Sequence, residues 1–390
     1  MPADAEIRGS CDDRFRAVRE AFAENFAERG ELGASLSVWV EARPVVELRG
    51  GWADSGRSRP WGEDTLVDVF SVGKAMAAIC VLMLSEEGRI DLDGPVSSLW
   101  PEFARAGKEG VTPRMILAHR AGVPGIRRPL GETAMYEWGT MTRALEEEEP
   151  WWEPGTAHGY HVNTFGFLVG ELVKRAAGTT LGELFRERVA EPLAADLHFG
   201  VPPGSEERVA EFLFDLDPPT ERDPLPDGIA PSGAMDPEMF RSVYFNPPGI
   251  SGMGTVNTPE WRAALMPSTN AHATARGIAR VCAALAGGGS LEGVRILDAA
   301  TIAEAATEAS GGPDFVLGRP SRFGLGFQLT QPERPLGPGE HGFGHFGAGG
   351  SLGFADPDHG LAFGYAMNAA GPRWQNPRNR ALIDAVYRSL

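Results

Sequence analysis

The sequence predicts an α+β fold, an α/β sandwich in which helices flank an antiparallel sheet, joined to an all-helical insert. Both ends of the chain combine helical patterns with hairpin-like alternation, whereas the middle consists of helical segments separated by Pro and Gly. Because strands from both ends can share one sheet, we expect an α/β domain from residues 1–95 and 271–390 and a mainly helical insert from residues 96–270.

The first part of the chain supplies a helix, a hairpin and a second helix. An amphipathic pattern covers residues 12–29. Apolar and polar residues alternate over residues 34–40, and residues 45–50 complete a β-hairpin. The apolar run at residues 71–87 predicts a buried helix, and Gly88 stands where a C-cap is expected.

The insert contains a series of short helical patterns. They cover residues 113–119, 135–149, 165–177 and 180–189. The second pattern closes in an acidic run, residues 146–149, which we expect to be solvated. Residues 202–260 are rich in Pro, Gly and Asp and are candidate substrate-facing loops.

Regular patterns return in the last third of the chain. Helices are predicted at residues 273–286, 299–309 and 377–389, and antiparallel strands at residues 323–329, 351–355 and 361–368. The sequence Asp-Pro-Asp-His-Gly at residues 356–360 favours a turn between the last two strands.

Composition narrows the class of function. The 390-residue chain carries a net charge of −17 and no run of Lys or Arg, which argues against binding of nucleic acid or an anionic membrane. No apolar run is long enough to span a bilayer, and residues 1–10 lack the apolar region of a signal peptide, so we expect a cytoplasmic protein. Cys11, Cys80 and Cys282 are widely spaced and are expected to stay reduced. No oligomeric state is predicted.

The helix at residues 71–87 opens with a chemically suggestive pair. Ser71 and Lys74 are three residues apart, so a hydroxyl and an amine share one face of the first turn, where backbone N–H groups favour negative charge. This arrangement suits an activated serine nucleophile. The alternative is an N-cap Ser71 with a solvated Lys74, but the apolar neighbours would bury the amine.

Two later stretches offer the other parts that a serine nucleophile needs, namely a proton shuttle and donors for an oxyanion. The first, residues 154–163, places Tyr160 after a tight turn. The second, residues 344–350, is a glycine-rich strand edge containing His345, where the backbone can approach a ligand closely.

In order and spacing, these three stretches resemble the motifs of the penicillin-recognising serine hydrolases. Those motifs are Ser-x-x-Lys, a Tyr-containing second motif and a Lys/His-x-Gly third motif, represented here by Ser71 to Lys74, Tyr160, and His345 to Gly347. The match is closest to the class C β-lactamase-like group and its esterase branch, the family VIII carboxylesterases, and spans residues 30–390. It implies a β-lactamase/penicillin-binding-protein-like fold.

The resemblance also implies roles. Ser71 would be the acylated nucleophile, and Lys74 and Tyr160 would share the proton transfers, with the identity of the base left open. The N–H groups of Ser71 and Ala348 would hold the oxyanion. We expect the pKa of Tyr160 to be lowered by cationic Lys74, and the pKa of Lys74 to be lowered by burial. The candidate substrate-binding residues are His345, Phe346, Gly347 and Trp152.

Two departures from the lactamase motifs favour an ester substrate. The second motif in lactamases is Tyr-x-Asn, but Val162 stands at the Asn position and Asn163 is one residue further on. His345 replaces the lysine that favours a substrate carboxylate. Both changes remove what a β-lactam or a D-Ala-D-Ala peptide needs, so we expect a serine carboxylesterase that acts on a small-molecule ester without a cofactor.

Three alternative functions stay open. The same acyl-enzyme could donate its acyl group to an alcohol or amine, as an acyltransferase that tailors a metabolite. The chain could be a β-lactamase or D-Ala-D-Ala peptidase, or a non-catalytic binding protein on the same fold.

Other local patterns carry less weight. His158 and His161 are three apart, but no carboxylate completes a metal-binding set, so no metal is expected. Trp152 is either a core residue or a wall of an acyl pocket. Residues 349–353 fit Gly-x-Ser-x-Gly, yet a strand rather than a helix is predicted after Ser351, so a nucleophile elbow is not expected there.

Overall fold

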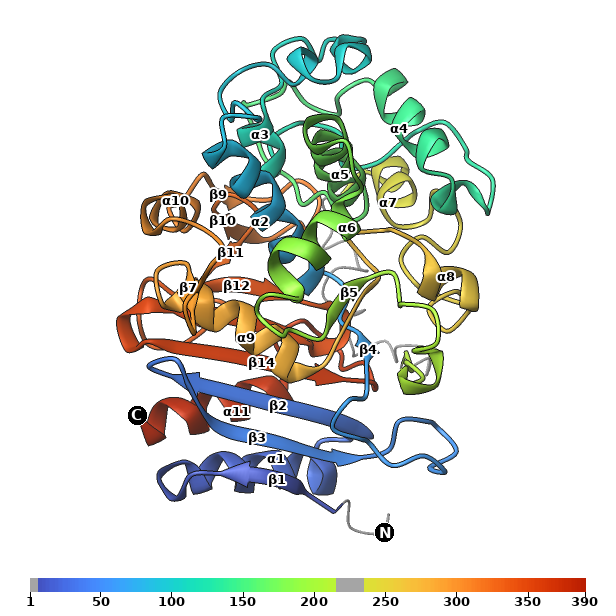
Figure 1. The fold of residues 1–390 in the computed structure, drawn as a ribbon. Helices are drawn as coiled ribbons and strands as arrows, with labels where there is room; N and C mark the ends of the chain where they lie inside the picture. Colours follow the sequence, from blue (N-terminus) through green and yellow to red (C-terminus); the bar gives the residue numbers. More distant parts are fainter. Residues whose placement is uncertain (1–5, 215–234) are drawn as a thin grey trace.

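A computed structural model describes residues 6–214 and 235–390, and an antiparallel sheet of nine strands dominates this described part (Figure 1). In spatial order the strands are β1 (Arg8–Cys11), β3 (Arg43–Gly51), β2 (Gly33–Val40), β14 (Leu361–Met367), β13 (Leu352–Asp356), β12 (Phe343–Phe346), β11 (Gln328–Leu329), β10 (Pro320–Phe323) and β9 (Ser310–Pro313). Strands from the two ends of the chain meet where β2 pairs with β14. The predicted sheet is confirmed.

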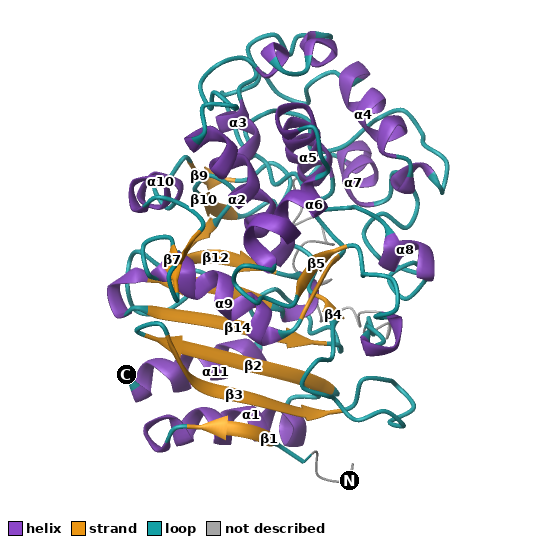
Figure 2. Cartoon of the chain, viewed as in Figure 1, coloured by secondary structure: helices purple, strands orange, loops and turns teal. Residues whose placement is uncertain are grey.

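Helices cover both faces of this sheet (Figure 2). Helices α1 (Arg16–Glu28) and α11 (Pro377–Ser389) pack together on one face, and α9 (Ala275–Ala286) lies across β14, β2 and β13 on the other. Gly364 of β14 allows close packing, because a side chain there would overlap the backbone of α9. Every residue of β14 is buried as a result.

Helix α2 (Val72–Glu86) connects the sheet to the helical half of the molecule. Its residues from Val72 to Leu84 are all buried, because it packs against β12 on one side and α5 and α6 on the other. The helices above the sheet in Figure 1 are α3 (Pro113–Leu117), α4 (Trp138–Glu147), α5 (Thr164–Ala177), α6 (Leu181–Phe185), α7 (Pro237–Tyr244) and α8 (Pro259–Ala263). This surrounding of apolar helix faces is what buries Lys74.

Short elements complete the described chain. A second sheet contains β4 (Val67–Asp68), β6 (Ala271–Ala273) and β5 (Leu197–Phe199), and a third contains β7 (Ser290–Leu291) and β8 (Val294–Arg295). Helix α10 (Ala299–Ala305) ends earlier than predicted. The strand predicted at residues 323–329 is instead divided between β10 and β11, because Gly326 has a φ of +83° and packs so tightly on Ala78 that a side chain would not fit.

The prediction of a solvated acidic run at residues 146–149 is wrong for two of its members. Glu146 and Glu148 are buried. The Trp100 indole N–H donates to Glu146 Oε1 at 2.7 Å, and Lys108 Nζ donates to the backbone carbonyls of Glu146 and Glu148. Since these donors satisfy the end of α4, the run anchors that helix instead of facing water.

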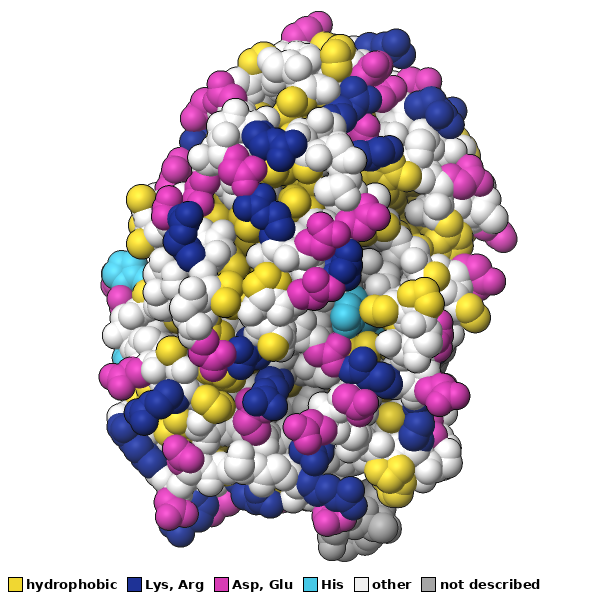
Figure 3. Space-filling model, in the orientation of Figure 1, with side chains coloured by type: hydrophobic (Ala, Val, Ile, Leu, Met, Phe, Trp, Pro, Cys, Tyr) yellow, Lys and Arg dark blue, Asp and Glu magenta, His cyan; other side chains and the backbone are white. Residues whose placement is uncertain are grey.

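The predicted loop region 202–260 is only partly described. Helix α7 and the first two residues of α8 fall within it, and residues 215–234 lie outside the described residues. Among the residues that the structure describes, no helix is both long and apolar enough to cross a membrane. Figure 3 shows acidic and basic side chains intermixed on one face of the molecule.

Candidate active site

Ser71 and Lys74 lie together at the start of α2. Ser71 immediately precedes the helix, and Lys74 Nζ is 2.9 Å from Ser71 Oγ. The amine also donates to the backbone carbonyl of Ser268 at 2.9 Å, and the Ser268 hydroxyl in turn accepts from the N–H of Gly166 at 2.6 Å. The sequence pattern did not reveal Ser268, because its contribution is a backbone carbonyl on a distant segment.

The environment of Lys74 favours a neutral amine. The side chain is 0% exposed, and it makes no ion pair with a described carboxylate. Burial therefore lowers the pKa of Lys74 well below its ordinary value, as expected. A neutral amine beside a serine hydroxyl has a lone pair that can accept the hydroxyl proton.

Tyr160 lies over this pair, as the order of the motifs predicts. Its ring centre is 4.9 Å from Lys74 Nζ, and the ring stacks on Phe323 at a centroid distance of 5.7 Å. The Tyr160 hydroxyl makes no hydrogen bond of standard geometry in the described part of the chain. Its proximity to Ser71 lowers its pKa and so partly offsets the increase that burial causes.

The expected lowering of the pKa of Tyr160 is wrong. Burial raises this pKa well above its ordinary value. We expected a positively charged Lys74 to lower the pKa of Tyr160. Lys74 is itself buried, however, and burial favours its neutral form. Burial therefore favours a protonated phenol at Tyr160 beside a neutral amine at Lys74.

A buried carboxylate that the sequence did not reveal fixes the position of Tyr160. Asp314 Oδ1 accepts the backbone N–H of Tyr160 at 3.1 Å and the N–H groups of Val316 and Leu317. Its Oδ2 accepts the Ser321 hydroxyl at 2.8 Å, and that hydroxyl lies 2.9 Å from His158 Nε2. Asp314 is 154 residues away from Tyr160 and belongs to no motif.

The two histidines considered as metal ligands have other partners. His158 contacts Ser321, whereas His161 donates from Nδ1 to the Gly159 carbonyl at 2.7 Å and accepts from the Val123 N–H at Nε2. Within residues 6–214 and 235–390, no group of three His, Cys, Asp or Glu side chains has the arrangement of a metal site.

His345 is a buried residue near the end of its strand. It lies on β12, with its ring centre 5.9 Å from that of Tyr160. Nδ1 is 2.7 Å from the Phe346 carbonyl, so this nitrogen carries the proton, and Nε2 has no partner among the described residues. Burial, together with the nearby Lys74, lowers the pKa of His345 to about 3.

The turn that follows β12 lies against the segment preceding the nucleophile. A side chain at Gly347 would overlap the carbonyl of Val69, so only glycine permits this approach. The N–H groups of Ser71 and Ala348 donate to no acceptor in the described chain. One of these backbone donors belongs to Ser71 itself and the other to the turn that packs on the segment before it, an arrangement that suits the binding of an oxyanion.

The residue before the nucleophile has an unusual backbone. Phe70 has a φ of +48°, and its N–H donates to Asp68 Oδ1 at 2.7 Å. Asp68 Oδ2 accepts the indole N–H of Trp261, also at 2.7 Å. Burial raises the pKa of Asp68 to about 8. This acid, which the sequence analysis did not single out, thus holds the turn that presents Ser71.

The remaining candidates lie around the second and third motifs. Trp152 packs on the turn before Tyr160, since a side chain at Gly159 would come within 2.7 Å of its ring. Phe346 is buried and donates its N–H to Gln328 Oε1 at 3.0 Å. Ser351 is followed by strand β13, which is not the strand–turn–helix of a nucleophile elbow.

Comparisons with known proteins relate nearly the whole chain to one family. A family model described as Beta-lactamase matches residues 18–388. The esterase/beta-lactamase LipL of Mycobacterium tuberculosis is 34% identical over 382 residues, which cover 94% of this chain and 84% of that protein. A family VIII carboxylesterase structure is 41% identical, with a TM-score of 0.90 and coverage of 99% and 100% of the two chains. A penicillin-binding protein homolog from Caulobacter crescentus is 38% identical, with a TM-score of 0.88 and the same coverage.

Proposed function

This chain belongs to the beta-lactamase family and is a serine ester hydrolase, and we propose that it acts through an acyl-enzyme formed on Ser71. The observation that carries the proposal is the 2.9 Å contact between Ser71 Oγ and Lys74 Nζ, made where burial lowers the pKa of the amine. An amine that is neutral before the reaction can take the serine proton at once.

In the proposed acylation, Lys74 accepts the proton of Ser71 as Oγ attacks the ester carbonyl carbon. The resulting oxyanion binds the N–H groups of Ser71 and Ala348. The carbon–oxygen bond to the alcohol then breaks, and Tyr160 donates its phenolic proton to the departing oxygen, while the ammonium of Lys74 returns a proton to Tyr160. The raised pKa of Tyr160 supports its role as the acid, and the lowered pKa of Lys74 supports its role as the base.

Deacylation would use the same groups in reverse. Water attacks the acyl carbon as the Tyr160–Lys74 pair accepts one of its protons, and Ser71 Oγ leaves and takes that proton back. The acid is released, and Ser71 and Lys74 return to their starting states.

Uncharged esters are the proposed substrate class. His345 is neutral at physiological pH and presents a bare Nε2, so it offers a substrate carboxylate no cation. Asn163 uses its Nδ2 for the Val243 carbonyl at 2.7 Å and for Ser251 Oγ at 3.1 Å, so this donor is engaged inside the protein. We propose that Trp152, Phe346 and Gly347 form walls of the binding site.

The experiment that tests the mechanism combines turnover with mass spectrometry. With p-nitrophenyl esters, we expect an acyl-group mass increase on Ser71 that disappears, together with hydrolysis, in Ser71→Ala. Ser351→Ala is the matched control, because it removes a second buried serine hydroxyl, one that makes no hydrogen bond within the described chain, and it should keep its activity. Unchanged hydrolysis in Ser71→Ala would overturn the proposal, and a chromogenic cephalosporin hydrolysed as fast as the esters would overturn the substrate class.

Two wider proposals accompany the chemistry. The first is the division into an α/β domain (1–95 and 271–390) and a helical insert (96–270); it is supported by a nine-stranded sheet whose described strands all come from residues 8–51 and 310–367. The second is that the enzyme acts on a small-molecule ester in the cytoplasm without a cofactor. Limited proteolysis that cuts first inside the sheet-forming segments would argue against the division.

A further inference from the structure

We infer that Asn376 and Asn379, at the start of α11, are positioning residues that hold the oxyanion-binding turn at Ala348. This inference rests on the proposed function, since it assumes that the Ala348 N–H binds the oxyanion. The turn lies between β12 and β13, and its Gly349 and Gly350 have φ angles of +78° and +120°. A turn built on two such glycines has little rigidity of its own.

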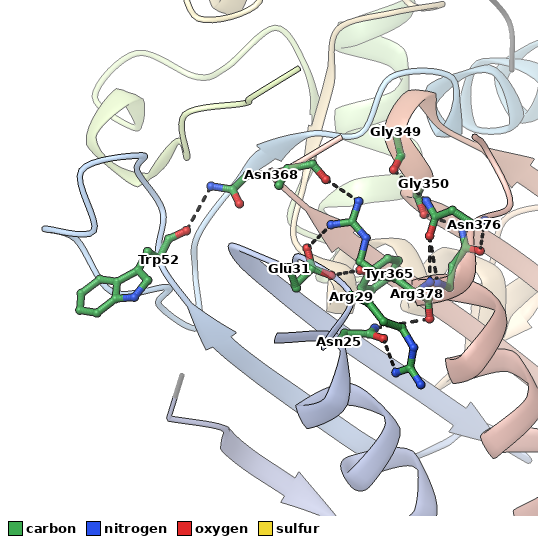
Figure 4. Close-up of polar contacts among 12 residues, drawn as sticks. Asn25, Arg29, Glu31, Trp52, Gly349, Gly350, Tyr365, Asn368, Asn376 and Arg378 are labelled. Carbon is green, nitrogen blue, oxygen red and sulfur yellow. Dashed lines mark hydrogen bonds and ion pairs between the residues drawn. The ribbon is translucent and has the colours of Figure 1, made fainter. Parts of the chain in front are cut away.

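The carbonyls of these two glycines are held from α11. Asn376 Nδ2 donates to the Gly349 carbonyl at 3.1 Å (Figure 4). Asn379 Nδ2 donates to the Gly350 carbonyl at 2.9 Å. The packing is close, because a side chain at Gly350 would overlap the Asn376 amide. Both asparagines are buried.

These bonds connect to Ala348 through two peptide planes. The Gly349 carbonyl that accepts from Asn376 shares its peptide unit with the Gly350 N–H. That N–H donates to the Gly347 carbonyl at 3.2 Å, and the Gly347 carbonyl shares its peptide unit with the Ala348 N–H. Because each peptide unit is planar, fixing the Gly349 carbonyl also fixes the direction of the Ala348 N–H.

Helix capping alone does not require these amide groups to donate. Asn376 Oδ1 accepts the N–H groups of Arg378 and Asn379, and Asn379 Oδ1 accepts the N–H of Asn376 at 3.0 Å. Capping therefore uses the side-chain oxygens, and the nitrogens remain for the turn and for the carbonyls of Arg373 and Trp374. Because helix capping and support of the turn use different atoms of these side chains, the two roles can be tested separately.

The start of α11 is itself fixed to the sheet. The Arg378 guanidinium pairs with Glu31 at 2.9 Å and donates to the Ala369 carbonyl at 2.7 Å, and the Tyr365 hydroxyl of β14 donates to Glu31 (Figure 4). The asparagines thus transmit the position of a rigid element to the turn.

Asn376→Asp is the informative substitution. An aspartate keeps the capping oxygen at the positive end of the helix but places an acceptor against the Gly349 carbonyl. The Gly371 N–H, which also donates to that carbonyl at 2.8 Å, would remain. We expect kcat on a p-nitrophenyl ester to fall about 10- to 100-fold with KM within about twofold, since only a transition-state contact is lost. Affinity for a boronic acid that mimics the tetrahedral intermediate should fall in parallel with kcat.

Two further variants keep the inference falsifiable. Asn376→Ser retains an N-cap but is too short to reach the turn, so it should show the same kinetic pattern if aspartate disturbs the fold. Thr180→Ala removes the N-cap hydroxyl of α6, which exchanges hydrogen bonds with Glu183, and should lower the melting temperature while kcat stays unchanged. The inference would be overturned if both Asn376 variants kept the wild-type kcat. It would also be overturned if the loss of kcat in each variant equalled the fraction of protein that is unfolded. If Ser71→Ala also kept full activity, the proposed function itself would have failed.

Discussion

At the scale of single residues, the proposed chemistry depends on a buried lysine that has no carboxylate partner in the described chain. Lys74 makes two polar contacts, with the Ser71 hydroxyl and the Ser268 carbonyl. Lys74→Arg puts a permanently charged group at this position, so no neutral base remains. We expect the rate of acylation to fall by about 10²- to 10⁴-fold, measured as the pre-steady-state release of p-nitrophenol.

The pH profile of the wild type tests the same residue. As pH falls through the lowered pKa of Lys74, the amine gains a proton and kcat/KM should fall. The pKa of Tyr160 is raised well above 10.0, so its ionisation causes no loss of activity below pH 10. Lys108→Arg is the matched control, because Lys108 is also buried but its amine contacts the carbonyls at the end of α4 and the Phe103 ring, and its profile should match the wild type. A Lys74→Arg enzyme in which kcat/KM depends on pH as it does in the wild type would contradict the role of Lys74 as the base.

At the scale of elements, the entry to α2 depends on Asp68. Its pKa of about 8 means that, between about pH 4 and pH 8, the unfolded chain loses a proton that the folded chain retains. The contribution of Asp68 to the free energy of unfolding therefore falls as pH rises across that range. In Asp68→Asn this contribution is absent, and the amide oxygen can still accept from the Phe70 N–H.

The measurement is thermal unfolding of both proteins at several pH values from 5 to 8. We expect the melting temperature of the wild type, relative to Asp68→Asn, to decrease as pH rises. A constant difference between the two proteins across this range would show that Asp68 does not titrate there.

At the scale of the whole molecule, a buried network joins the two ends of the chain. Glu31, which follows α1, pairs with Arg378 of α11 and accepts the hydroxyl of Tyr365 from β14. Removing one partner leaves an uncompensated buried charge, so Arg378→Gln should lower the free energy of unfolding by about 3–5 kcal/mol in urea titrations. Combining it with Glu31→Gln should cost less than the sum of the two single losses.

An exposed ion pair on the same helix is the control for that prediction. Arg380 pairs with Asp384 one turn later, at 3.0 Å, and both side chains are at least 40% exposed. Arg380→Gln should therefore cost less than about 1 kcal/mol. Equal losses of unfolding free energy in Arg378→Gln and Arg380→Gln would contradict the distinction between the buried and the exposed ion pair.

Some of this architecture could be predicted from the sequence because it depends on local patterns. The apolar run of α2 and the alternation in the β2–β3 hairpin are visible in short windows, and the spacing of Ser71 and Lys74 follows from helix geometry. Strands of two to four residues such as β1 and β4 are too short to show a period. Ser268 and Asp314 act through contacts with distant segments, which no local pattern reveals. The shift in the pKa of Tyr160 was predicted in the wrong direction, because depth of burial is a property of the assembled fold.

The pairing of β2 with β14 has a consequence for synthesis on the ribosome. Residues 34–40 pair with β3 on one side and receive residues 361–367 on the other, so this second edge of β2 stays unpaired until residues 361–367 have been made. An open edge of this kind favours association with other chains. The nucleophile emerges long before the turn at Ala348, so a nascent chain holds a serine without its second oxyanion donor. We therefore expect ester hydrolysis to begin only after residues 343–367 have been made and β14 has paired with β2.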